Sequence, residues 1–363
     1  MPRVRKPIFK VIYNKKDITA DITPYLSSIV YKDADQGKSD SVELEVTNAT
    51  GIWLDEWYPT MGDTLSVSMG FNTELFSCGL FQIDEVEWKL SPDIICIKGI
   101  AADITDTVRT KQSDQHENKT LRQIAQKIAS RYGYTIQGNI PDTGQISRET
   151  QILETDLGWL NKLSRQYGYL FSLRGKVMVF TNIIDLESQP PVTTITRRQL
   201  VPGSSLRDKS YDTYKKVHVL HYDPTAKKVI ETNFSFPVIT NKDGFSYNGI
   251  VKKDTKEVRV RLDNNNQADL KAVAALHSSN SMQQEGKLRM TGNPLILSGT
   301  NFTLTECGKL SGVYHIYAST HSLNAKGAWT TEADVKRVGY VDIEKTKRHK
   351  PKKVKAVRVN VIM

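Results

Sequence analysis

One strand pattern occurs twice in this chain, and it constrains the possible folds more than any other feature of the sequence. The first copy places a glycine, an aromatic residue, an isoleucine and a second aromatic residue at Gly79, Phe81, Ile83 and Trp88. The second copy has the same spacing at Gly312, Tyr314, Ile316 and His321. Each copy follows a short strand opened by glycine, residues 62–68 or 299–305, and leads through a turn into a return strand. The pattern therefore predicts two similar all-β units.

The spacing inside each copy also predicts a β-bulge. Side chains of a strand alternate between two faces, so Phe81 and Ile83 share a face whereas Val86 and Trp88 have the other parity. The parity changes at the same place after Ile316. One extra residue bends a strand and helps a sheet to curl, so we expect two β-barrels. Chance likeness between two β-hairpins is the alternative, because short strand patterns are permissive.

The length and composition are those of an ordinary globular protein. The chain has 363 residues, enough for two or three domains, with 39% hydrophobic and 25% charged residues. No apolar run approaches the roughly 20 residues that a membrane helix needs, and the N-terminus does not resemble a signal peptide. We therefore expect synthesis in the cytoplasm and no membrane insertion. The three isolated cysteines, Cys78, Cys96 and Cys307, favour reduced thiols over a disulfide framework or a zinc site.

The positive charge is concentrated in a tail at residues 345–363. The chain has a net charge of +10, of which eight basic residues without an acid in the tail supply +8, so residues 1–344 carry only +2. A basic tail can bind polyanions, remain a solvated extension, or dock as a strand on a partner. Alternating valines favour the docking strand. The predicted partner contacts in the tail are Lys352, Lys353, Lys355, Val357, Arg358, Val359 and Val361.

The pattern of residues predicts an α+β protein that is mainly β. Residues 1–105 form the first β-barrel, 106–205 an α+β insert, 206–344 a second barrel with an inserted helix at about 267–284, and 345–363 the tail. In the insert, Thr120 and Gln123 have capping-box spacing before a helix that Gly133 ends. A second helix starts near Thr155 and ends at Gly168. A hairpin over Gly175 follows it.

No arrangement of residues indicates catalysis, a cofactor or a metal. His218 and His221 are three apart on a predicted strand and point to opposite faces, so they cannot chelate one ion. His315 and His321 lie roughly 20 Å apart along a strand and cannot share one either. Phosphate-loop, dinucleotide, nucleophile-elbow and zinc-protease motifs are absent from the sequence. We therefore expect a protein that is not an enzyme.

Several short motifs, taken in order, resemble a known family. They are Ile18-Thr19 after a polar turn, Asp40-x-x-Glu43-Leu44, the run 157–163 with Tyr167-Gly168-Tyr169, the Gly175 hairpin, and Gly312-x-Tyr314-x-Ile316 with His321, Gly327 and Thr330. Together they resemble the late control protein D family, the baseplate hub of contractile phage tails. That family is related to the hub part of type VI secretion spike proteins.

The resemblance implies a structural role and a set of partners. Family members form trimers in which three chains with two barrels each make a pseudo-sixfold ring. Such a ring joins a sixfold tail tube to a threefold spike, lies near tape-measure and baseplate wedge proteins, and lets DNA or cargo pass without specific binding. The implied location is the virion baseplate, assembled in the host bacterial cytoplasm. The eight residues of the two strand patterns would then be barrel framework.

Two departures and two alternatives accompany this interpretation. The chain ends soon after the second barrel, so the spike would be a separate protein, and Ser319 occupies a position where a bulkier apolar residue is expected. A nucleic-acid-binding module that uses the basic tail is one alternative function. A tail protein that binds or processes cell-wall glycan is the other, although the sequence shows no fused lysozyme-like segment.

Overall fold

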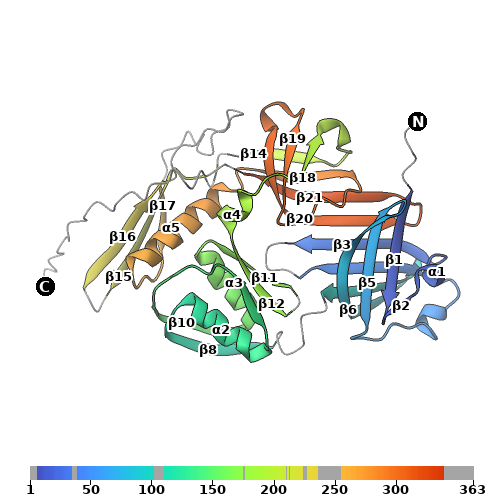
Figure 1. Cartoon of the computed structure of the whole chain (residues 1–363), viewed down its shortest axis with the longest axis horizontal. Helices are drawn as coiled ribbons and strands as arrows, with labels where there is room; N and C mark the ends of the chain where they lie inside the picture. Colours follow the sequence, from blue (N-terminus) through green and yellow to red (C-terminus); the bar gives the residue numbers. More distant parts are fainter. Residues whose placement is uncertain are drawn as a thin grey trace.

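The computed structural model describes residues 6–34, 39–101, 110–174, 176–209, 211, 213–223, 227–235 and 255–338. Over these residues the protein is α+β and mainly β, with large antiparallel sheets and few helices (Figure 1), as the sequence predicts. Among the described helices, none is long and apolar enough to cross a lipid bilayer.

Strands from both ends of the chain form one 13-stranded sheet. The N-terminal strands are β1 (Pro7–Tyr13), β2 (Lys16–Asp17), β3 (Leu26–Ala34), β4 (Ser41–Thr47), β5 (Thr64–Phe71), β6 (Glu74–Leu90) and β7 (Asp93–Ala101), with the short helix α1 (Thr19–Ile22). The C-terminal strands are β13 (Thr193–Thr196), β14 (Ser205–Asp208), β18 (Gln284–Thr291), β19 (Asn301–Thr305), β20 (Gly312–Asn324) and β21 (Trp329–Arg337). The strand order is β14-β18-β21-β20-β3-β4-β7-β6-β5-β1-β2; in addition, β19 pairs with β20 and β13 pairs with β19. Strands β3 and β20 therefore join the two units.

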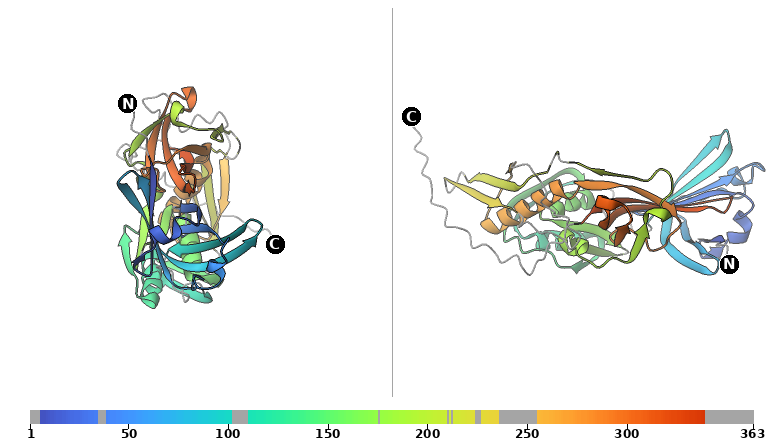
Figure 2. Two further views of the ribbon diagram at one scale, coloured as in Figure 1. Left: turned by 90° about the vertical axis from the view of Figure 1, so that its right-hand side faces the viewer. Right: turned by 90° about the horizontal axis from the view of Figure 1, so that it is seen from above.

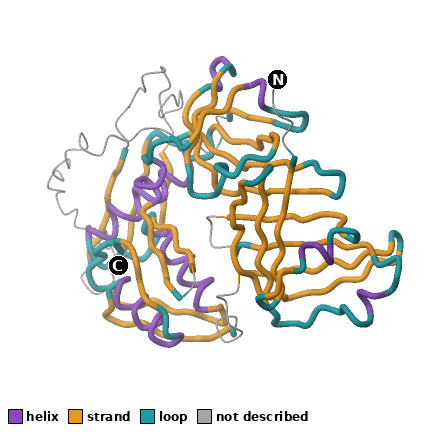
Figure 3. The backbone as a smooth tube through the Cα atoms, turned by 45° about the vertical axis from the view of Figure 1, so that its right-hand side comes forward, coloured by secondary structure: helices purple, strands orange, loops and turns teal. Residues whose placement is uncertain are grey.

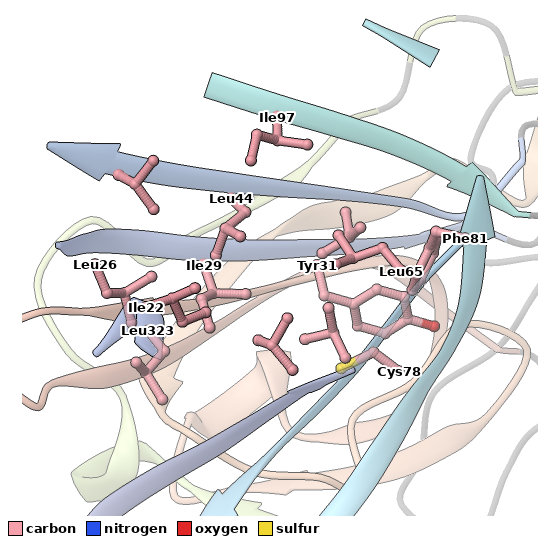
Figure 4. Close-up of a cluster of buried hydrophobic side chains, with 14 of the residues drawn as sticks. Ile22, Leu26, Ile29, Tyr31, Leu44, Leu65, Cys78, Phe81, Ile97 and Leu323 are labelled. Carbon is pink, nitrogen blue, oxygen red and sulfur yellow. The ribbon is translucent and has the colours of Figure 1, made fainter. Parts of the chain in front are cut away.

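Period-two alternation builds the core of the first unit. Val42, Leu44 and Val46 on β4 are buried, whereas the residues between them are only partly covered. Figure 4 shows side chains from β3, β4, β5 and β6 converging on this core. Leu323 and Trp329 of the second unit belong to the same cluster, so the core continues across the joint between the two units.

The second unit has a smaller core of its own. It is formed by strand residues that include Ile195, Leu288, Phe302, Tyr314, Ile316 and Val335. The ring centroids of Phe302 and Tyr314 lie 5.9 Å apart.

The α+β insert follows the first unit. It contains β8 (Lys111–Lys119), α2 (Leu121–Tyr132), β9 (Thr135–Gly138), β10 (Ile146–Thr155), α3 (Asp156–Gln166), β11 (Tyr169–Arg174), β12 (Val177–Asn182) and α4 (Ile183–Glu187). The predicted capping box is confirmed, because the Thr120 hydroxyl accepts a bond from the Gln123 amide and the Gln123 side chain accepts one from the Thr120 amide. Gly133 follows α2 with a φ of 68°, and β11 pairs with β12 as the predicted hairpin. Gly175 lies outside the described residues.

The segment between β14 and β18 differs from the expectation. The sequence predicts a helix inserted into the second unit. Instead, β15 (Lys216–Asp223), β16 (Lys228–Phe234) and β17 (Thr255–Arg259) form a separate sheet with α5 (Asn265–Asn280) packed on it, and among the described strands they pair only with one another. The helix ends at Asn280 because Gln284 already begins β18. Its buried apolar positions are Ala268, Ala272, Ala274 and Leu276, whereas Leu270 and Val273 are only partly covered.

These parts lie along the long axis of the molecule. Figure 2 shows the first β unit, with α1, at one end and the longer helices α2, α3 and α5 at the other, with β20 and β21 between them. Figure 3 shows that most of the helical turns lie together on one side of the large sheet.

A buried polar cluster holds this helical side against the large sheet. The Asn301 amide nitrogen on β19 donates to the carbonyl oxygens of Leu186, Glu187 and Gln189 at 3.2, 3.1 and 2.7 Å. The Glu187 carboxylate lies 2.8 Å from Nε2 of His277 on α5 and 2.6 Å from Nζ of Lys336 on β21. Burial opposes ionisation of Glu187, but these two partners hold the pKa of its carboxyl well below the usual range.

Asn301→Ala should destabilise the protein by about 2–4 kcal/mol, because it removes the buried amide to which three backbone carbonyl groups are bonded. The measurement is the free energy of unfolding in urea. Asn265→Ala, at the exposed start of α5, is the matched control and should change stability by less than about 0.5 kcal/mol. Equal effects of the two substitutions would contradict the role of Asn301.

Candidate assembly surface

The two copies of the strand pattern occupy the same position in their units. Leu65 of β5 pairs with Phe81 of β6, and Phe302 of β19 pairs with Tyr314 of β20. The glycine that opens each preceding strand is also held alike. Gly62 donates its amide to the Ile83 carbonyl at 2.9 Å, and the Gly299 amide donates to the Ile316 carbonyl at 2.8 Å. The likeness therefore extends from the sequence to the backbone hydrogen bonds.

Both copies contain the predicted bulge. The pairing of β6 with β7 shifts between Ile83 and Glu85, and the pairing of β20 with β21 shifts between Ile316 and Ala318. The prediction of one extra residue at the same place is therefore confirmed. The next strand outward differs, because β1 runs antiparallel to β5 whereas β13 runs parallel to β19.

The residues of the strand pattern divide into buried and exposed members. Phe81, Ile83, Tyr314, Ile316 and His321 are all at most 2% exposed. Gly79 and Gly312 have φ values of 120° and 152°, and a Cβ atom at Gly312 would lie 2.6 Å from the Arg337 guanidinium. Trp88 differs from its counterpart His321, because its side chain is 50% exposed.

The contrast between Trp88 and His321 arises from the strand beside each of them. Residues 318–324 of β20 pair antiparallel with residues 28–34 of β3, and His321 lies opposite Tyr31. Their rings stack with centroids 6.0 Å apart. Ser319 lies opposite Asp33 and is buried there, so the small side chain that departs from the family pattern sits inside this joint. The Asp33 carboxylate accepts hydrogen bonds from the amide and hydroxyl groups of Ser298.

His321 is held as a neutral imidazole inside this joint. Its Nε2 donates to the Ile296 carbonyl at 3.0 Å, and its Nδ1 accepts from the Thr331 hydroxyl at 3.0 Å. Burial lowers the pKa of His321 to about 4, because the charged form would lose its hydration. Both ring nitrogens are already used, so a second proton would displace the Thr331 hydroxyl as a donor.

The corresponding stretch of β6 has an open edge. Residues 85–90 pair with β7 on one side, while β5 pairs with β6 only as far as Gln82. Within the described ranges, no strand pairs with the other side of this stretch. Trp88 and Leu90 lie here and are 50% and 72% exposed. Large exposed apolar side chains on an unpaired strand edge are typical of a surface that another strand covers.

A group of acidic residues and a thiol on the neighbouring strands does not have the character of a metal site. Ligand atoms of Glu43, Glu45 and Cys96 lie within 4.8 Å of one another. Burial raises the pKa of Cys96 to about 12, and its protonated thiol donates to the Glu43 carboxylate at 3.1 Å. Lys89 lies 3.3 Å from Glu45, and Lys32 lies 3.7 Å from Glu43. The arrangement is a network of ion pairs around a neutral thiol.

The tail residues Lys352, Lys353, Lys355, Val357, Arg358, Val359 and Val361 lie outside the described residues. The sequence does not indicate the burial of Asp33, Glu187 and Asn301, because polar residues in strands or at helix ends usually face solvent. Only their partners, which are distant in the sequence, explain their burial.

Acidification from pH 7 to pH 4.5 should lower the stability of the wild-type protein more than that of His321→Gln. The folded state holds His321 with its pKa at about 4, whereas the unfolded chain takes up the proton near pH 6.5. The contribution of neutral His321 to the free energy of unfolding is therefore complete above about pH 6.5. It is lost as the pH falls towards 4, by up to roughly 3 kcal/mol. Thermal unfolding midpoints at the two pH values provide the measurement. His221→Gln leaves His321 intact and should keep the wild-type difference, and an identical difference in His321→Gln would refute this role.

Comparison with known proteins gives one type of curated relative and a consistent fold. No protein-family model matches the chain. The "Probable baseplate hub protein" of Escherichia phage P2 is 26% identical over 197 residues, which cover 53% of this chain and 50% of that protein. The match thus spans about half the length of the relative.

Solved structures match over most of the chain. A tail protein from Neisseria meningitidis MC58 superposes with a TM-score of 0.64 at 13% identity, over 92% of this chain and 97% of its own. An Escherichia coli component of the type VI secretion system, described as structurally similar to tail proteins of bacteriophage T4, superposes with a TM-score of 0.53 at 10% identity, over 87% of this chain and 74% of its own. The curated relative and these folds agree with the resemblance to baseplate hub proteins that the sequence motifs indicate.

Proposed function

We propose that this chain is the structural hub of the baseplate in a contractile phage tail or a related injection particle. Its role would be mechanical coupling and adaptation of symmetry, without catalysis or a cofactor. Three chains would close into a ring with pseudo-sixfold symmetry, because each chain supplies two similar β units. Such a ring would join the sixfold tail tube to a threefold spike made by a separate protein, and DNA or cargo would pass through its channel.

The observation that carries this proposal is the repeated β unit. The two copies share their hydrogen-bond register and the position of their bulge, and β3 and β20 join them into one sheet. A repeat within one chain can give a trimer two similar contacts per subunit, which matches a partner of sixfold symmetry on one side of the ring. The residues that would form the barrel framework are Gly79, Phe81, Ile83, Trp88, Gly312, Tyr314, Ile316 and His321.

The proposed domain limits follow the same argument. Residues 1–105 and 206–344 would be the two ring units, and residues 106–205 would be an insert carried on them. Residues 345–363 would contact a neighbouring chain or the spike. The tape-measure and wedge proteins would be further partners in the virion baseplate.

The purified protein should have a mass three times the 41.0 kDa of one chain. Light scattering on a sizing column measures this mass without assuming a shape. A trimer would support the ring, and averaged electron micrographs should then show pseudo-sixfold particles. A monomer at every concentration up to the solubility limit would count against the ring.

The eight basic residues of the tail favour a nucleic-acid-binding module as the second candidate function. Deletion of residues 345–363 distinguishes this function from that of a hub. Under the hub proposal the truncated protein should remain a trimer and bind its spike or neighbouring chains less tightly. A nucleic-acid-binding module would instead lose salt-sensitive DNA binding when the tail is removed. Retention of both spike binding and DNA binding would contradict both roles of the tail.

A further inference from the structure

The joint between β3 and β20 has two sides, and each side has a counterpart elsewhere in the chain. Both counterparts are strand edges without a partner strand among the described residues. Inside the chain, β20 pairs with β3. The repeat makes β6 the counterpart of β20. The counterpart of β3 can be found by following the registers across each unit.

The registers identify β14 as the counterpart of β3. Each series crosses three strand pairings and ends on the isoleucine of the repeat. The first runs through Tyr31, Val42, Gly99 and Ile83. The second runs through Leu206, Gly286, Val335 and Ile316. Tyr31 and Leu206 therefore occupy equivalent positions, and the pairing of Leu200 with Met290 repeats that of Leu26 with Val46.

Strand β14 is open where β3 is covered. It pairs with β18 on one side, and within the described ranges no strand pairs with its other side. Residues 85–90 of β6 are open in the same way. These two edges belong to different β units, so they can meet only if two chains come together.

We propose that β6 of one chain pairs with β14 of the next chain, antiparallel and in the register of the internal joint. This inference rests on the proposed ring and specifies its interface. In the internal joint, Thr320 lies opposite Lys32 and His321 lies opposite Tyr31. Transferred through the repeat, that register places Glu87 opposite Arg207, Trp88 opposite Leu206, and Glu85 opposite Lys209.

The charges on the two edges are complementary in this register. On β6, Glu85 and Glu87 lie 2.9 and 3.4 Å from the Lys98 ammonium group. Lys89 lies 3.9 Å from Glu87 but is closer to Glu45, at 3.3 Å, so three carboxylates share two ammonium groups. Beside β14, Arg207 and Lys209 share the Glu285 carboxylate at 2.6 and 2.8 Å, so cations are in excess. Opposite charges directly across an antiparallel pair stabilise it, and like charges destabilise it. This register thus brings the excess carboxylates of β6 opposite the excess cations beside β14.

The opposite face of the same edge offers apolar surface. Trp88 and Leu90 correspond to His321 and Leu323, which the internal joint buries to 0% and 3% exposure. A neighbouring β14 would cover Trp88 with Leu206, as β3 covers His321 with Tyr31. A shift of one residue would turn the acidic side chains to this face, so the register is strongly specified.

The contact is of the head-to-tail type. Because β6 and β14 are different surfaces of one chain, each chain can give one edge to one neighbour and receive another edge from the next. Internal and intermolecular joints would then alternate around the ring. A closed trimer satisfies every such edge.

The test is a disulfide between chains of Glu87→Cys/Arg207→Cys, because facing residues of an antiparallel pair meet the distance that a disulfide requires. Mild oxidation should give species of two and three chains on a non-reducing gel, reversed by reductant. Lys32→Cys/Thr320→Cys is the matched control for geometry, since it should cross-link within one chain without a change in mass. Glu87→Cys/Ser205→Cys tests the register, because it displaces the second cysteine by two residues and should cross-link at least tenfold less.

The outcomes separate this interface from the proposed function. A trimer in which the matched pair fails to cross-link, while the internal control succeeds, would overturn the interface and leave the hub intact. A wild-type protein that stays monomeric, with no cross-link at the matched pair, would contradict the ring and the interface together. Glu87→Cys alone and Arg207→Cys alone control for the native thiols, of which Cys78 and Cys96 are buried. Their sizing profiles also check that the substitutions leave the fold and the trimer in place.

Discussion

The pairing of β3 with β20 is the constraint on which the rest of the large sheet depends. It joins strands that are almost three hundred residues apart and makes one sheet and one continuous core from two similar units. The neutral His321 and the Asp33–Ser298 hydrogen bonds lie within it. A buried polar group is stable only when its partners are all in place, so these contacts favour one arrangement of the two units over a loose association.

A second set of buried polar contacts joins the helical layers to the same sheet. Asn301 and Glu187 connect β19, α4, α5 and β21, and each uses partners from distant parts of the sequence. Removal of one partner would leave a charge or a carbonyl group unsatisfied in the interior, which costs more than a hydrogen bond on the surface. The insert is thus held against the second unit.

Much of the local structure follows from the sequence. The repeated pattern predicts both bulges, the capping box predicts the start of α2, and the hairpin expected after the second helix is formed by β11 and β12. The sequence does not predict the separate sheet that precedes β18. Alternation indicates that β15 and β16 are strands but does not indicate which sheet they join. The burial of α5 depends on alanines that carry little hydrophobic signal.

The sequence by itself determined the local elements, the repeat and, through ordered short motifs, the resemblance to baseplate hub proteins. Only the tertiary structure decided which strand edges are paired and which are open, and so distinguished the buried His321 from the exposed Trp88 at equivalent positions. The physical reason is that a period-two pattern specifies which face of a strand is buried, whereas its hydrogen-bonding edges carry the same backbone groups in every strand. The partner of an edge is therefore chosen by contacts between residues far apart in the chain.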